Sequence, residues 1–165
     1  MKNPYLAKKN NQTHWFCILL GLLSVIIDQA SKIIAVNYLD LHIPVCIFPF
    51  LNFTLTFNTG ISFGMLNTHD STLLITVSII CLILIIWAYL GFKDAIERIF
   101  LTLVIGGAIG NLIDRFIHKA VIDFIDFCIP NSTWHFPTFN VADIFVTVGA
   151  SCLVLYNLFK KHAIS

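Results

Sequence analysis

The chain has 165 residues, of which 58% are hydrophobic and only 12% are charged, and its mean hydropathy is +0.85. Ordinary soluble domains carry about 25% charged residues, so this composition excludes that class and predicts an integral membrane protein. Ten Lys and Arg residues nearly balance nine Asp and Glu residues, which gives a net charge of +1. This balance lacks the basic excess that would indicate a nucleic-acid partner.

The cysteines and histidines show no spacing that is typical of a metal site or a disulfide framework. The five cysteines form no C-x-x-C pair, and the six histidines form neither an H-E-x-x-H motif nor an i, i+4 pair. Cys46 and Cys128 both fall in predicted outer segments, but only that compartment favours a disulfide between them. We therefore expect no metal and no other cofactor, and a Cys46–Cys128 disulfide is the less favoured alternative.

The first predicted element is a transmembrane helix over residues 15–39. Three lysines precede its apolar run, a pattern that the start of a cleaved signal peptide shares. The apolar pattern continues beyond that run, however, and three more apolar segments follow it. We therefore predict an uncleaved span, whose far end carries Asp28, Gln29 and Lys32.

The segment that follows, residues 40–70, is predicted to be an outer loop, and it contains no Lys or Arg. Alternating apolar and polar residues over 51–57 predict short strands. The many aromatic residues of the loop are typical of a belt at the lipid interface. Asn58 and Gly60 predict an Asx turn, although an amide beside glycines also has the chemistry to hydrogen-bond an extended peptide.

Three further spans are predicted over residues 71–90, 99–116 and 141–159. The first of them has 20 residues and no charge, which at about 1.5 Å per residue matches a hydrocarbon core of about 30 Å. A short charged turn over residues 91–98 leads into the next span, where Gly106, Gly107 and Gly110 indicate close packing against another helix. Residues 117–140 form the second predicted outer loop.

Positive charge outside the spans lies almost entirely on one side of them. The two outer loops together contain a single basic residue, Lys119. Because Lys and Arg accumulate in cytoplasmic segments, we predict cytoplasmic termini and a single membrane domain of residues 1–165. The basic residues assigned to the cytoplasmic side are Lys2, Lys8, Lys9, Lys93, Arg98, Lys160 and Lys161.

The polar residues of the spans converge at one depth. Successive spans alternate in direction, so a residue late in the first span, late in the third or early in the fourth lies near the same face. Ionisable groups inside a membrane are costly and therefore indicate a functional site. The residues that meet there are Asp28, Lys32, Asn111, Asp114, Arg115, Asn140 and Asp143.

The carboxylates of this region differ in their sequence neighbours. Asp28 and Lys32 have i, i+4 spacing, which predicts a structural ion pair, and Asp114 adjoins Arg115, which predicts an ionised carboxylate that positions its neighbour. Asp123 and Asp143 have apolar neighbours and no adjacent cation. Two such carboxylates brought together share a proton, so that one serves as general base towards water and the other as general acid.

Several alternatives use the same residues. Asp126 is a rival partner for Asp123, although a solvated loop carboxylate is its simpler interpretation, and Asn111 and Asn140 also suit an ordinary helix position and an N-cap. A proton relay or ion site would use the same acids; it predicts polar groups at several depths and currents in proteoliposomes. A non-catalytic helical scaffold predicts that Asp123 and Asp143 together tolerate Ala or Asn.

Five sequence blocks, in order, resemble the bacterial lipoprotein signal peptidases, also called signal peptidase II. The segment between the fourth and fifth blocks, residues 128–136, matches no block and has no assigned role. Ser62 departs from the pattern, which often has Ala there. The matching blocks are residues 28–32 (DQASK), 58–63 (NTGISF), 106–115 (GGAIGNLIDR), 121–124 (VIDF) and 139–143 (FNVAD).

The resemblance implies an intramembrane aspartic endopeptidase with Asp123 and Asp143 as its catalytic dyad. It also implies that Asn58, Asn111, Arg115 and Asn140 contact the substrate or steady the dyad, and that Asp28, Lys32, Gly107 and Asp114 support the site. The implied substrates are prolipoproteins with a diacylglyceryl-modified cysteine, cleaved just before that cysteine. The implied protein is an all-α integral membrane protein of the bacterial inner membrane, with four transmembrane helices, a small extracytoplasmic β-rich cradle and an active site near the outer face. We expect a monomer whose partners are its substrates and membrane lipid.

Overall fold

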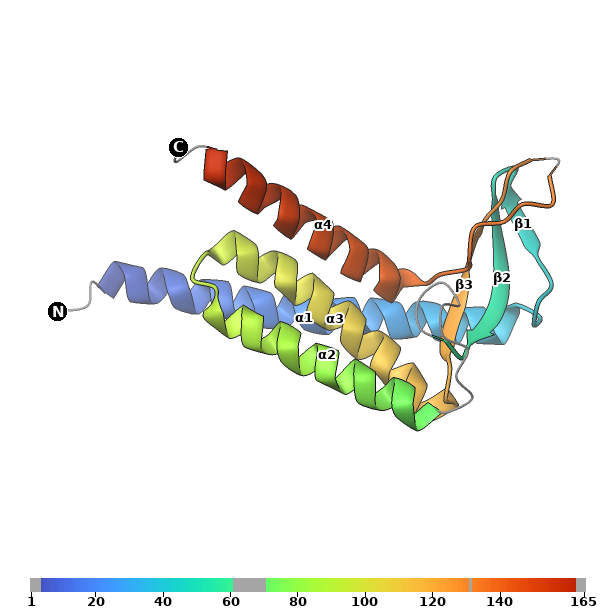
Figure 1. Cartoon of the computed structure of the whole chain (residues 1–165), viewed down its shortest axis with the longest axis horizontal. Helices are drawn as coiled ribbons and strands as arrows, with labels where there is room; N and C mark the ends of the chain where they lie inside the picture. Colours follow the sequence, from blue (N-terminus) through green and yellow to red (C-terminus); the bar gives the residue numbers. More distant parts are fainter. Residues whose placement is uncertain (1–3, 61–70, 131, 163–165) are drawn as a thin grey trace.

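The computed structural model describes residues 4–60, 71–130 and 132–162. Four long helices and a small sheet make up this part of the chain (Figure 1). The helices are α1 (Pro4–Tyr38), α2 (Ser71–Gly91), α3 (Ala95–His118) and α4 (Val141–His162). Each contains a segment long and apolar enough to cross a membrane, and these segments are Gln12–Tyr38, Thr72–Gly91, Ala95–His118 and Val141–Lys161. The four predicted transmembrane helices are therefore confirmed.

Two helix starts differ from the sequence-based bounds for local reasons. α1 begins at Pro4 rather than near residue 15, in keeping with the tolerance of proline in a first helical turn. α3 begins at Ala95 because Asp94 caps it: the Asp94 carboxylate accepts a hydrogen bond from the Ile96 backbone N–H at 2.9 Å. Such a cap satisfies one of the unpaired N–H groups at a helix start.

The sheet has three antiparallel strands in the order β1 (Val45–Phe48), β2 (Leu51–Asn58) and β3 (Val121–Phe127). The short strands predicted around residues 51–57 are confirmed, whereas β3 lies in the second predicted loop, where no strand had been assigned. The sheet lies at the end of the bundle where α1 and α3 end and α4 begins (Figure 1). Ala35, Leu55, Ile122 and Phe124 form the buried apolar core that joins it to the helices.

Close helix contacts at glycine hold α3 between its neighbours. A Cβ on Gly106 would clash with the Ser24 side chain of α1, and one on Gly110 would clash with Asp28 of the same helix. A Cβ on Gly107 would instead clash with the Ala142 carbonyl of α4. The small-residue spacing in α3 therefore permits close approach on two sides, as predicted.

The end of α3 determines how β3 packs against the helices. Lys119 adopts a left-handed conformation with φ of 57° and ends α3, after which the chain turns directly into β3. A left-handed residue is the common way to end a helix. The turn brings β3 back against the last part of α3 and against β2, so Asp123 faces the start of α4.

Candidate active site

A reciprocal cap at the start of α4 fixes the position of Asp143. The Asn140 Oδ1 atom accepts a hydrogen bond from the Asp143 backbone N–H at 3.0 Å, and Asp143 Oδ2 accepts one from the Asn140 N–H at 3.2 Å. This is the capping-box arrangement, in which the cap residue and the third helical residue satisfy each other. The predicted N-cap role of Asn140 is confirmed, and the cap holds the Asp143 carboxyl group at the helix N-terminus.

Asp123 reaches the same place from β3. Its side chain is buried, with Oδ2 accepting a hydrogen bond from Asn58 Nδ2 at 3.0 Å and Oδ1 accepting one from Asn140 Nδ2 at 2.6 Å. Burial, and next the negative charge of Asp143, raise the pKa of Asp123 from its usual value of 3.8 to about 7. A carboxyl group with such a pKa holds a proton near neutral pH.

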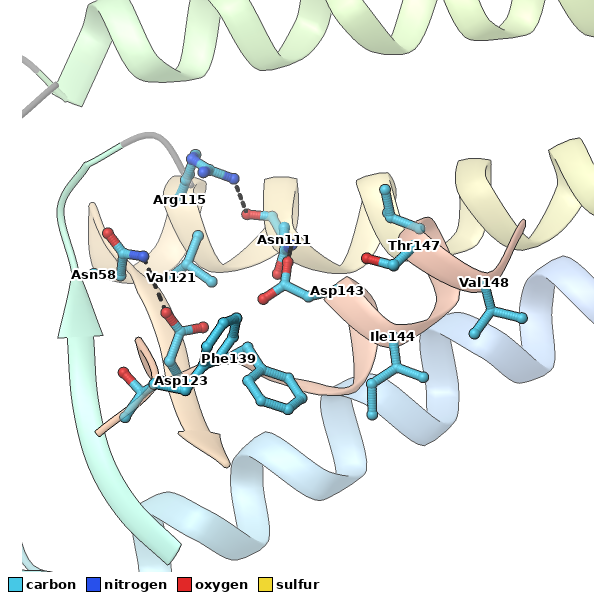
Figure 2. Close-up of a pocket in the computed structure, with 13 residues that line it drawn as sticks. Asn58, Asn111, Arg115, Val121, Asp123, Phe139, Asp143, Ile144, Thr147 and Val148 are labelled. Atoms are coloured by element: carbon cyan, nitrogen blue, oxygen red, sulfur yellow. Dashed lines mark hydrogen bonds between the residues drawn. The ribbon is translucent and has the colours of Figure 1, made fainter. Parts of the chain in front are cut away.

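The two aspartates share their polar neighbours. The Asn140 amide donates to the Asp123 carboxyl group while its oxygen accepts from the Asp143 backbone. Asn111 donates from Nδ2 to Asp143 Oδ1 at 2.9 Å. Figure 2 shows the carboxyl groups of Asp123 and Asp143 directed into one cavity from β3 and α4. The structure therefore brings together the two acids that the sequence analysis paired.

Asn58 forms the predicted turn and also contacts Asp123, a partner that was not predicted. Its Oδ1 accepts a hydrogen bond from the Gly60 N–H at 3.0 Å, which is the predicted Asx turn. Its Nδ2 simultaneously donates to Asp123. The turn therefore orients the amide that holds Asp123. The rest of this sequence block, residues 61–63, lies outside the described residues.

The buried Lys32 side chain supports the site from behind the residues that line the cavity. Lys32 Nζ lies 2.8 Å from Asp28 Oδ2 and 2.8 Å from Asp114 Oδ2, and it donates to Asn111 Oδ1 at 2.9 Å. The predicted Asp28–Lys32 ion pair is confirmed. Asp114 was predicted to be an ionised, positioning carboxylate because Arg115 adjoins it in the sequence, whereas the cation in contact with it is Lys32 from another helix. Adjacent helical residues point about 100° apart, which explains why sequence adjacency misled.

The two acids that flank Lys32 also brace the elements that carry the pair. Asp28 Oδ1 accepts a hydrogen bond from the Ala142 N–H in the first turn of α4 at 2.8 Å. Asp114 Oδ2 accepts one from the Ile122 N–H in β3 at 3.2 Å. Gly107 permits the same approach of α4, because any side chain there would clash with the Ala142 carbonyl. These residues therefore position Asp143 and Asp123 without lining the cavity.

Gln29 belongs to this support although the sequence analysis assigned it no role. Its Nε2 atom donates to the Gly110 carbonyl at 3.1 Å and to Asp114 Oδ1 at 3.0 Å, and it also contacts Asp28. The sequence does contain a signal for this role, because an amide side chain inside an apolar helix needs hydrogen-bond partners. The partners themselves lie on another helix, so one segment alone does not identify them.

Asp126, the rival partner for Asp123, is not the solvated loop residue that the sequence predicted. It is buried in β3, and its carboxyl oxygens contact Thr54 Oγ1 and His135 Nδ1, each at 2.8 Å. It does not line the cavity that Asp123 and Asp143 share. A spacing of three residues along a strand reverses the face, which separates Asp126 from Asp123.

The cavity has a volume of about 390 Å³, and most of its exposed lining is apolar. Arg115 lies at its rim, where its guanidinium donates to the Asn111 carbonyl at 3.2 Å (Figure 2). Of the predicted site residues, five line the cavity and five lie behind it. The lining residues are Asn58, Asn111, Arg115, Val121, Asp123, Phe136, Thr138, Phe139, Asp143, Ile144, Val146, Thr147 and Val148.

A family model described as signal peptidase (SPase) II matches residues 20–159 of this chain. The chain belongs to the signal peptidase II family. It is 40% identical over 158 residues to the lipoprotein signal peptidase of Coxiella burnetii, covering 93% of this chain and 96% of that protein. It is 40% identical over 147 residues to the lipoprotein signal peptidase of Brucella ovis, covering 86% of this chain and 88% of the relative.

Two solved structures of bacterial membrane enzymes share the fold of this signal peptidase II family member. One has a TM-score of 0.76 and 32% sequence identity, covering 88% of this chain and 89% of the other. The second has a TM-score of 0.72 and 33% identity, covering 87% of this chain and 92% of the other. Together with the four spans, these matches establish a multi-pass bacterial membrane protein and a peptidase.

Proposed function

We propose that the chain is an aspartic endopeptidase of the bacterial cytoplasmic membrane that removes the signal peptide from diacylglyceryl-modified prolipoproteins, cleaving just before the lipidated cysteine. The observation that carries this proposal is the placement of Asp123 and Asp143 on one cavity, joined through Asn140. The relatives named lipoprotein signal peptidases supply the substrate class. The two carboxyl groups in the cavity support acid–base catalysis of peptide hydrolysis.

In the proposed mechanism Asp123 carries the shared proton and Asp143 is ionised. Asp143 takes a proton from a water molecule as the water oxygen attacks the scissile carbonyl carbon, and Asp123 gives its proton to the carbonyl oxygen. As the C–N bond breaks, Asp143 donates its proton to the leaving amine and Asp123 regains one from the gem-diol. The dyad returns to its starting state, as acid–base catalysis requires. The mechanism calls on no metal or other cofactor.

The support around the dyad suits this chemistry. The amides of Asn58 and Asn140 hold Asp123, while Asn111 holds Asp143. Preorganised hydrogen bonds of this kind reduce the reorganisation needed at the transition state. Arg115, at the rim of the cavity, is proposed to hydrogen-bond the substrate backbone, and the apolar wall formed by Ile144, Val146 and Val148 is proposed to contact lipid or signal-peptide side chains.

The proposed orientation places the sheet and the cavity at the outer face of the membrane, with both termini in the cytoplasm. The start of α1 and the end of α4 lie at the end of the bundle opposite the sheet (Figure 1). Basic residues accumulate at that end, as expected for the cytoplasmic side. We also propose that the chain forms a single membrane domain and acts as a monomer.

The test uses purified protein and a synthetic precursor peptide with a diacylglyceryl cysteine. The wild type is expected to release the signal peptide with the cut just before that cysteine, as read by mass spectrometry. Asp123→Asn and Asp143→Asn are each expected to abolish release while the protein still inserts and folds. Asp94→Asn at the opposite end of the bundle is the matched control and should cleave like the wild type. Full activity in either dyad variant would refute the assignment.

A further inference from the structure

The last part of β3, next to the connector that leads to α4, contains a buried carboxylate that the proposed chemistry does not use. Asp126 is only 3% exposed, and both of its oxygens are engaged, one by Thr54 Oγ1 and one by His135 Nδ1. Burying a carboxylate is costly unless hydrogen bonds compensate it. An ionised carboxylate only accepts hydrogen bonds, so this contact with the ionised form requires the hydrogen on Nδ1 of His135. The pair therefore ties the connector to the sheet.

The connector is extended where this tie is made. His135 forms a bridge with Cys128, and the Phe136 N–H donates to the Phe127 carbonyl at 2.7 Å. Successive side chains of an extended segment point to opposite sides. With His135 turned towards Asp126, Phe136 is turned the other way, and it lines the cavity that contains Asp123 and Asp143.

Two further contacts define where the Phe136 ring lies. The ring packs edge-on against Phe139, with centroids 6.0 Å apart, and Phe139 also lines the cavity. On the other side of Phe136, Thr138 is hydrogen-bonded to Thr56 of β2 at 2.8 Å. The connector is therefore held on both sides of Phe136, by the Thr138–Thr56 hydrogen bond and by the His135 side chain, which is 44% exposed, in addition to the backbone hydrogen bond of Phe136 itself.

We propose that His135, held by Asp126, is a positioning residue that fixes Phe136 in the cavity wall and so sets the affinity for the apolar part of the substrate. This inference rests on the proposed function and deepens it, because it assigns a role to His135 and Phe136, which matched no sequence block. His135 does not touch the reacting atoms. It acts through the ring beside it.

The main test separates KM from kcat. His135→Ala is expected to raise KM for the lipidated precursor about fivefold or more, with kcat within about twofold, because only an apolar substrate contact is loosened. His135→Asn places an amide N–H near the position of Nδ1 and should restore most of the affinity. Trp134→Ala, a truncation of the exposed neighbour that does not line the cavity, is the control.

A coupling measurement distinguishes positioning from a merely structural effect. Phe136→Ala should raise KM at least as much as His135→Ala, and the double variant should be no worse than Phe136→Ala alone. Multiplicative effects would overturn the proposal. So would an equal rise of KM in Trp134→Ala, or a fall in kcat without a change in KM.

A second readout does not depend on activity and so keeps the two proposals apart. Fluorine NMR of 4-fluorophenylalanine at position 136, in detergent, should give one narrow line in the wild type and in His135→Asn. His135→Ala should shift or broaden that line. An unchanged line overturns the positioning role even if the wild type cleaves the precursor, whereas a wild type that fails to cleave overturns only the proposed function.

Discussion

Each end of the helix bundle has a lysine between two carboxylates, yet the two clusters have different consequences. At the sheet end, Lys32 lies 2.8 Å from both Asp28 and Asp114. At the opposite end, Lys160 lies 2.8 Å from Asp94 and 3.1 Å from Glu97. The Lys32 side chain is 1% exposed and that of Lys160 is 36% exposed. Burial of the lysine, rather than the number of charges, distinguishes the cluster that supports the cavity from the one at the opposite end.

The same contrast appears in two aspartates outside the spans. A hydrogen bond from Lys160, and then one from the Ile96 backbone, lower the pKa of Asp94 to about 2. Burial, and then the charge of Asp143, raise the pKa of Asp123 to about 7. Perturbation of this upward kind near neutral pH is what acid–base catalysis requires. This contrast supports the proposal that proton transfer takes place at the sheet end of the molecule.

Removal of the buried cation is expected to have the largest effect on stability. Lys32→Met leaves Asp28 and Asp114 buried without a counter-charge, which costs about 3–5 kcal/mol when one partner of a buried pair is lost. It also removes the hydrogen bond to Asn111, which holds Asp143. Thermal unfolding in detergent and precursor cleavage should both show the loss. A variant of wild-type stability would contradict the role given to this cluster.

The close contact between α3 and α4 should be the next most sensitive feature. Gly107→Ala forces the Ala142 backbone away and displaces the first turn of α4, and overpacking of this kind costs about 1–3 kcal/mol. Precursor cleavage should fall as well, because Ala142 lies between Asn140 and Asp143. Gly91→Ala is the matched control, since a Cβ there has no atom within 4 Å. Equal behaviour of the two variants would show that the contact is unimportant.

The pH dependence of cleavage should report Asp123. Because its pKa is raised to about 7, the group loses its proton above neutrality, and kcat/KM should fall about tenfold per pH unit there. The stability of the folded state should also decrease with rising pH. The folded state binds this proton more tightly than the unfolded state, so the free energy of unfolding falls as pH rises from about 4 to about 7. A cleavage rate that is flat up to pH 9 would argue against a protonated Asp123.

The smallest effect is expected at the cluster of Lys160, Asp94 and Glu97. Lys160→Met removes the partner of both acids; Glu97 is buried, but the Lys160 side chain is 36% exposed, so water screens its charge and the contribution is small. The thermal midpoint should change far less than in Lys32→Met, and cleavage should be unaffected. Since the pKa of Asp94 is lowered, any stability from this pair is present above pH 4 and lost as pH falls towards 2. A large loss of stability in Lys160→Met near neutral pH would contradict the contrast between the two ends of the helix bundle.

The sequence predicted those features of the site that depend on local patterns. Hydropathy located the spans, alternation of direction brought Asp143 to the depth of Asn111, and helical spacing paired Asp28 with Lys32. The N-cap role of Asn140 followed from its position before an apolar helix. These successes share one cause, because each depends on residues within one helix or on the fixed length of a span.

The errors arose where the partner lies on another element. Asp114 pairs with Lys32 across two helices, and Asp126 is buried against Thr54 and His135, which approach from another strand and from the connector. β3 itself was missed, because its strand is defined by pairing with β2. Sequence neighbours alone do not determine such contacts, and the resemblance to known blocks did not specify them.

The most direct test of the dyad compares single and double substitutions on one precursor. If Asp123 and Asp143 act as one unit around one water, Asp123→Asn, Asp143→Asn and the double variant should show the same residual rate, since groups that work together are not additive. Rates that fall in proportion with each substitution, or a single variant that cleaves at the wild-type rate, would contradict the shared mechanism.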